Sequence, residues 1–228
     1  MTERQTIFNR QQAALRNALT AGRDAQEAIE LFLDQQARVH AAQTTFSNTP
    51  SLEDEIWEGL SEAGARRIPA KGEHSIAWIF WHITRIEDTT MNLLVAGSPQ
   101  VFNLEPWKER LKVAVEDSGN SMSPGEILRL CESIDLAELR SYRTRVGRRT
   151  REIVQGLKTE DFNCKVDPVR LQRVMDEGAL VESSRPILEY WGGRTIAGLL
   201  LMPPTRHSFI HLNEAAHIKQ KLKKEKQP

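Results

Sequence analysis

Apolar residues recur at helical intervals through four long segments of this chain, and few segments show the alternation typical of a β-strand. The four segments span about residues 3–43, 74–97, 123–157 and 204–222. A chain of this kind buries its apolar stripes by packing helix against helix. We therefore predict an all-α protein in which residues 1–228 form a single helical-bundle domain.

Several residues mark where these helices begin and end. Ser123 followed by Pro124 is a strong helix start, because serine caps the first turn and proline fits the first helical position. Gly97 is a normal helix stop. The first long segment is expected to break near Gly22. The run TIAGLLLM, residues 195–202, fits either a helix or a buried strand.

The charge balance of the chain limits its partners. Its 31 basic and 31 acidic side chains give a formal net charge of zero. Proteins that bind nucleic acids or membrane surfaces usually carry a strongly basic surface, so we expect neither partner. Six arginines gather in residues 140–151, and we interpret them as a solvated helix face that balances acidic helices.

The cysteines and the apolar runs bear on the compartment. Cys131 and Cys164 are far apart and form no C-x-x-C pair, so neither a disulfide framework nor a cysteine zinc site is predicted. The N-terminal residues show no secretory signal, and no apolar run approaches the roughly 20 residues that cross a bilayer. These features predict a soluble, cytoplasmic protein.

Three histidines are candidate metal ligands. His207 and His211 are four residues apart, so a helix places both imidazoles on one face. His82 lies on a mainly apolar face of its own predicted helix. If the two helices are neighbours, three nitrogens can hold Zn, Ni, Fe or Cu and leave a position open. The alternative is that each imidazole only hydrogen-bonds within the core.

Two stretches containing these histidines resemble a known family. They are IAWIFWHITRIEDTTMNLLV and PPTRHSFIHLNEAAHIKQKL, which resemble the DinB-like (DinB/YfiT) superfamily of metalloenzymes. The resemblance implies a four-helix bundle with an unusual helix order, here with extra short helices in the connections. It also implies a divalent metal held by His82, His207 and His211. Zn or Ni is the first expectation, and Fe, Mn or Cu are the others.

The sequence departs from the family pattern just after His211. NEAAHIKQ, residues 213–220, looks like the family string H-E-x-x-H-x-G-Q with its first histidine lost. In that register His217 would replace His207 as a ligand. We rank this second, because His211 and His217 are six residues apart and point to nearly opposite sides of a helix.

Other residues are candidates for supporting roles. Glu87 and Glu214 are candidates to orient an imidazole, since metal-bound histidines commonly have carboxylate partners, or to serve as a base. Segments 98–122 and 158–188 have no counterpart in the family pattern, and we expect them to shape the mouth of any pocket.

The resemblance also implies a function. Relatives with a known activity perform thiol chemistry with a low-molecular-weight bacterial thiol such as bacillithiol or mycothiol. The chain is therefore expected to be a metal-dependent, thiol S-transferase-like enzyme that acts on a small molecule, and a homodimer. The alternative is a non-catalytic helical protein that binds a small ligand or serves a stress response.

Overall fold

The computed structural model describes residues 2–21, 24–69 and 74–225. Within these residues the secondary structure is helical, and the only extended pairing is an isolated bridge between Lys165 and Thr195. The prediction of an all-α protein is confirmed. No helix in the described part is both long enough and apolar enough to cross a bilayer.

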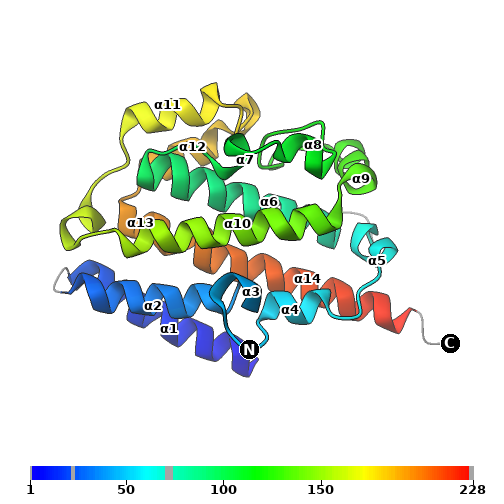
Figure 1. Cartoon of the computed structure of the whole chain (residues 1–228), viewed down its shortest axis with the longest axis horizontal. Helices are drawn as coiled ribbons and strands as arrows, with labels where there is room; N and C mark the ends of the chain where they lie inside the picture. Colours follow the sequence, from blue (N-terminus) through cyan, green and yellow to red (C-terminus); the bar gives the residue numbers. More distant parts are fainter. Residues whose placement is uncertain (1, 22–23, 70–73, 226–228) are drawn as a thin grey trace.

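The first long segment forms two helices, α1 (Glu3–Ala21) and α2 (Ala25–Ala37), which pack against each other (Figure 1). Asp24 starts α2, because its side chain accepts a hydrogen bond from the main-chain N–H of Gln26. The expected break is therefore present, although Gly22 itself lies outside the described residues. Three short helices follow: α3 (Ala42–Thr45), α4 (Leu52–Trp57) and α5 (Glu62–Arg66).

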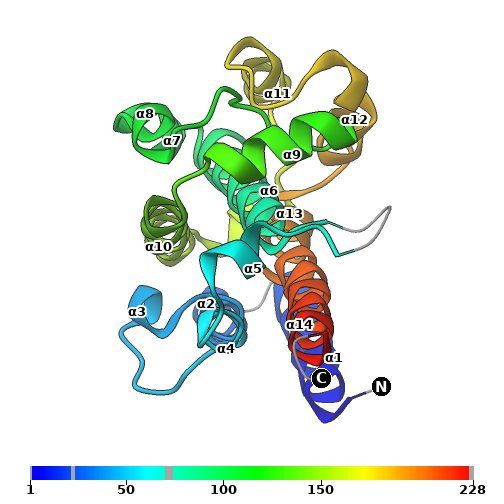
Figure 2. The same cartoon turned by 90° about the vertical axis from the view of Figure 1, so that its right-hand side faces the viewer.

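The second long segment is the centre of the molecule. It consists of α6 (Ile76–Asp88), which continues as a π-helix, η1 (Thr89–Ala96), and ends at Gly97 in a left-handed conformation. Figure 2 shows α9, α10 and α14 on different sides of α6, and all three contact it. As a result every residue of α6 is buried, and not only the one face that the periodicity predicted.

The third long segment differs from its prediction as one helix. It forms α9 (Pro124–Ser133) and α10 (Leu136–Gln155), with a break between them. Asp135 causes the break, because its carboxylate accepts hydrogen bonds from the N–H groups of Ala137 and Glu138 and so starts a new helix. The predicted start at Ser123 is present, with a capping box to Glu126.

Short helices fill the connections, as expected. Between η1 and α9 lie α7 (Val101–Leu104) and α8 (Trp107–Leu111). After α10 come η2 (Thr159–Asn163), α11 (Pro168–Asp176), η3 (Glu182–Ser184), α12 (Arg185–Gly192) and α13 (Ile196–Leu200). The run TIAGLLLM is thus helical. The chain then passes through a second π-helix, η4 (Met202–His207), into α14 (Ser208–Lys224).

A buried carboxylate ties the end of α6 to its neighbours. Asp88 accepts hydrogen bonds from five donors on four different elements. They are the main-chain N–H groups of Val101 and Phe102 and the side chains of Arg85, Asn92 and Tyr142. Because both oxygens only accept, no neutral side chain of this shape satisfies all five donors.

Replacing Asp88 with Asn is expected to destabilise the fold by about 3 kcal/mol, since an amide NH2 would face donors and leave Arg85 without its charged partner. Denaturant unfolding followed by circular dichroism measures the change. The control is Glu62→Gln, whose side chain is 79% exposed in an ion pair with Arg66 and is expected to change stability by less than about 0.5 kcal/mol. Equal effects of the two substitutions would contradict this account of Asp88.

Candidate metal centre

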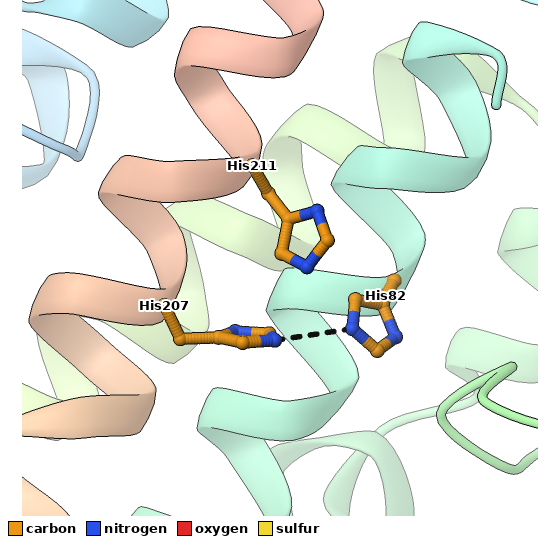
Figure 3. Close-up of side chains that lie close together, drawn as sticks. All are labelled: His82, His207 and His211. Atoms are coloured by element: carbon orange, nitrogen blue, oxygen red, sulfur yellow. Dashed lines mark hydrogen bonds between the residues drawn. The ribbon is translucent and has the colours of Figure 1, made fainter. Parts of the chain in front are cut away.

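Three imidazoles from separate parts of the chain meet between α6 and the last helices. His82 is on α6, His207 is the last residue of η4, and His211 is on the first turn of α14. One ring nitrogen from each lies within 4.8 Å of the others. Figure 3 shows the three rings turned toward one another. In the part of the chain that the structure describes, no other three His, Cys, Asp or Glu side chains converge in this way.

The separation of two of these nitrogens suits a shared cation. The Nε2 atoms of His82 and His207 are 3.2 Å apart. Two imidazole nitrogens bound to one tetrahedral metal at about 2.0–2.1 Å would lie about 3.3 Å from each other. Three nitrogen donors of this kind match the preferences of Zn, Ni and other divalent transition metals.

Hydrogen bonds at Nδ1 fix which nitrogen of two rings is free. The Nδ1–H of His82 donates to the carbonyl oxygen of Ser118 at 2.8 Å, and that of His211 donates to Oε2 of Glu214 at 3.0 Å. Since both acceptors lack a proton to donate, the Nε2 lone pair of each ring is left free. The Nδ1 atom of His207 is buried and has no hydrogen-bond partner among the described residues.

The environment also favours neutral rings. Burial lowers the pKa of His82 to about 4, against a smaller opposing effect of the Ser118 carbonyl. Burial, reinforced by His82 and His211, holds the pKa of His207 well below its ordinary value. Both rings are therefore uncharged at neutral pH, which is the form that binds a metal. The three histidines named from the sequence thus converge, and their donors fit a divalent cation.

Glu214 joins this group and brings a fourth histidine with it. Its Oε1 accepts a hydrogen bond from Nδ1 of His74 at 2.9 Å, while Oε2 accepts the one from His211. Burial alone would raise the pKa of Glu214, but the two imidazoles outweigh it and lower that pKa, so the carboxylate is ionised. Glu214 was a candidate from the sequence. His74 was not.

The ring of His74 also reaches the triad by stacking. It stacks on Trp78 with ring centroids 3.9 Å apart, and Trp78 stacks in turn on His82 at 4.8 Å. These three residues are spaced by four along the sequence. That spacing was the signal for His74, because it is the spacing of side chains on one face of a helix, and His74 lies two residues before α6.

Two other candidates lie away from the triad. Glu87 does not reach it, because its carboxylate accepts a hydrogen bond at 2.8 Å from His40, and both side chains are fully buried. His217 is exposed on α14 and is not part of the group of three. The geometry therefore favours His207 over His217.

The two connecting segments 98–122 and 158–188, which could not be placed from the sequence, meet beside the site. Ser118, in segment 98–122, provides the carbonyl that holds His82, and its own N–H donates to the carbonyl of Ala179 in segment 158–188. The hydroxyls of Ser121 and Ser184 are also 2.6 Å apart. The two segments thus support each other, and one of them contacts a triad ring.

The helical fold of the described residues and the three convergent imidazoles place this chain among helical proteins with a candidate divalent-metal centre. A comparison with protein families finds a match to the DinB superfamily over residues 45–214, a range that contains all three histidines. The chain belongs to the DinB superfamily, and the predicted resemblance is confirmed. The match also runs through both segments that sequence reasoning left unplaced. A comparison with curated proteins finds no match.

Gly119 offers a test of how Ser118 supports the site. Gly119 has a φ of +79°, and a Cβ added there would lie 3.0 Å from Nε1 of Trp78. Gly119→Ala is expected to cost about 1 kcal/mol for its left-handed backbone and also to displace the Ser118 carbonyl from His82. The measurement is the side-chain ¹⁵N chemical shifts of His82, together with thermal unfolding.

The matched control is Gly59→Ala. Gly59 has a similar φ of +64° but no atom within 4 Å of an added Cβ. It is expected to lose about the same stability while leaving the His82 shifts unchanged. Unchanged His82 shifts in Gly119→Ala would show that the ring does not depend on this turn.

Proposed function

We propose that this protein is a metal-dependent enzyme whose divalent cation is held by His82, His207 and His211. The observation that carries the proposal is the convergence of three imidazoles from α6, η4 and α14, two of them with Nε2 left free by hydrogen bonds at Nδ1. Three protein ligands leave at least one position for a substrate, which is typical of catalytic and not of structural sites. Zn or Ni is the first expectation for the metal, followed by Fe, Mn or Cu.

The proposed substrate class is a low-molecular-weight thiol of the bacillithiol or mycothiol type, and the proposed activity is S-transfer. A bound divalent cation supplies positive charge that stabilises the thiolate form of such a substrate near neutral pH. The chain's own residues hold the ligands and limit the access of water. His82 is 3% exposed and Trp78 covers one face of its ring. His211 is more accessible to solvent than His82, because its side chain is 19% exposed.

We further propose a cytoplasmic homodimer that acts on small molecules and binds neither nucleic acids nor membranes. Cys131 and Cys164 are both unpaired, which suits a reducing compartment. Several arginines of α10 are occupied within the molecule. Arg143 is buried against Glu53, and Arg148 and Arg151 donate to main-chain carbonyls.

One observation favours a non-catalytic alternative. At 3.2 Å, Nε2 of His207 can donate a hydrogen bond to Nε2 of His82, so these two nitrogens can satisfy each other without a cation. In that case the protein would be a helical small-ligand-binding or stress-response protein. Metal analysis separates the two functions.

Replacing His211 with Ala is expected to reduce bound metal from about one ion per chain to a small fraction of that, because two imidazoles hold a divalent ion far less tightly than three. Elemental analysis after dialysis against a defined Zn²⁺ buffer is the measurement. His217→Ala, on the exposed side of the same helix, is the control and should retain the metal. Unchanged metal content in His211→Ala would overturn the proposed site.

The thiol part of the proposal has its own test. Adding a cysteine-derived thiol to Co²⁺-loaded protein is expected to produce a sulfur-to-cobalt charge-transfer absorption in the near ultraviolet, because thiolate is a good ligand for an open site. The corresponding serine-derived alcohol is the control and should produce none. A spectrum that does not respond to thiols, with cobalt still bound, would reject the thiol while keeping the metal site.

A further inference from the structure

A circuit of contacts outside the triad links two of the three ligands, His211 and His82. It runs from His211 to Glu214, from Glu214 to His74, from His74 to Trp78, and from Trp78 to His82. The direct contact between the rings of His82 and His211 closes it. Two of its steps are hydrogen bonds, of 3.0 and 2.9 Å, and two are ring stacks, with interplanar angles of 13° and 5°. It joins α14 to His74, just before α6, and to α6 itself.

The three ligands differ in what holds each ring. His82 is buried and bonded to a main-chain carbonyl, which cannot change rotamer. His207 is half-buried, and its buried Nδ1 atom has no hydrogen-bond partner among the described residues. His211 is half-buried as well, and it is the ligand whose Nδ1 is hydrogen-bonded to a side chain, that of Glu214. The orientation of His211 therefore depends on Glu214 more than that of either other ligand depends on a side chain.

Glu214 in turn needs support. Its side chain is 34% exposed, and a carboxylate on a helix surface ordinarily samples several rotamers. His74 removes this freedom, because it binds the second carboxylate oxygen and is itself held flat against Trp78. A carboxylate with both oxygens occupied by separate elements presents a fixed acceptor to His211.

We propose that Glu214 is a positioning residue for His211, that His74 is a positioning residue for Glu214, and that the pair sets the affinity of the triad for its cation. The inference rests on the proposed function, because it assigns a role at the same cation site. Physically, the carboxylate holds the proton of His211 on Nδ1, directs the Nε2 lone pair at the site and makes that nitrogen a stronger donor.

The rival explanation is that the hydrogen bond between Glu214 and His74 only fastens α14 to the start of α6. The chain offers a matched control for that role. Glu225, just after α14, forms an ion pair of 2.7 Å with Arg67, the residue that follows α5. Glu225→Gln therefore breaks another link between α14 and the chain that precedes α6, without touching the circuit.

The experiment compares Glu214→Gln, His74→Phe and Glu225→Gln with the unaltered full chain. His74→Phe keeps an aromatic ring for Trp78 and removes only the hydrogen bond to Glu214. The affinity for Zn²⁺ is measured by competition with a chromophoric chelator, and the melting temperature is measured on metal-free protein. Glu214→Gln is expected to weaken Zn²⁺ binding roughly 10–100-fold and His74→Phe by up to about tenfold, as outer partners of metal-bound histidines generally do. Glu225→Gln should leave the affinity unchanged.

A second measurement needs no metal. Side-chain ¹⁵N spectra of the metal-free protein report which nitrogen of His211 carries the proton. The unaltered chain is expected to show the Nδ1–H form alone, and both Glu214→Gln and His74→Phe should show a mixture of the two tautomers. A merely structural link would change the melting temperature without changing this ratio.

The outcomes separate the two proposals. If the unaltered chain binds Zn²⁺ at a site that His211→Ala abolishes, but Glu214→Gln and His74→Phe keep its affinity and tautomer, the positioning role is wrong and the proposed function stands. If the unaltered chain binds no Zn²⁺, the proposed function and the affinity role both fail. An affinity lost equally in Glu225→Gln would show that only the fastening of the helices matters.

Discussion

Complete burial of α6 is the constraint on which the rest of the structure depends. Each of its polar side chains lies in the interior, and a buried polar group without a partner costs free energy. His82 therefore requires the Ser118 carbonyl, Glu87 requires His40, and Asp88 requires the N-terminus of α7. These partners lie on separate elements, so satisfying one helix positions much of the chain around it. The connecting segments acquire their places in the same way as the long helices do.

The same burial prepares His82 for chemistry. A ring removed from water loses its charged form, and a neutral imidazole with one nitrogen engaged has one lone pair to offer. The fold therefore specifies both the protonation state of the ligand and the direction of its free nitrogen before any cation is considered. His207 shares the desolvation but has no partner at Nδ1, and His211 has the partner with less burial. The three rings reach a common point by three different local means, and this makes their sensitivities to mutation different.

Helical periodicity was enough to predict the all-α fold class, whereas the shared site of the three histidines was predicted from periodicity together with the resemblance to the DinB superfamily. Helical spacing put His207 and His211 on one face and His82 on the apolar side of its own helix, and the structure has the three together.

The break at Asp135 was missed. An aspartate in the first, acidic part of a helix and an aspartate that caps a new helix look alike in sequence, and only the hydrogen bonds distinguish them. Glu87 illustrates a further limit. Its position beside the metal-ligand stretch suggested a role at the triad, but its rotation about α6 directs it at His40. Pairings between elements distant in the sequence, such as His74 with Glu214, depend on tertiary packing that no local pattern encodes.

The approach of the chain to His207 shows why the ligand spacing alone does not define the site. Residues 202–207 form a π-helical turn that contains Pro203 and Pro204, and neither proline has an N–H to donate to the preceding turn. Two hydroxyls stabilise this wider turn. Thr205 donates to the carbonyl of Leu200, and Ser208 donates to that of Pro203, each five residues back. A wider turn rotates the next helical residues relative to their places in a regular α-helix, so the direction in which His207 leaves the backbone is set by these prolines and hydroxyls. The H-x-x-x-H spacing makes His207 and His211 neighbours, and the π-helical turn before them helps determine that they face His82.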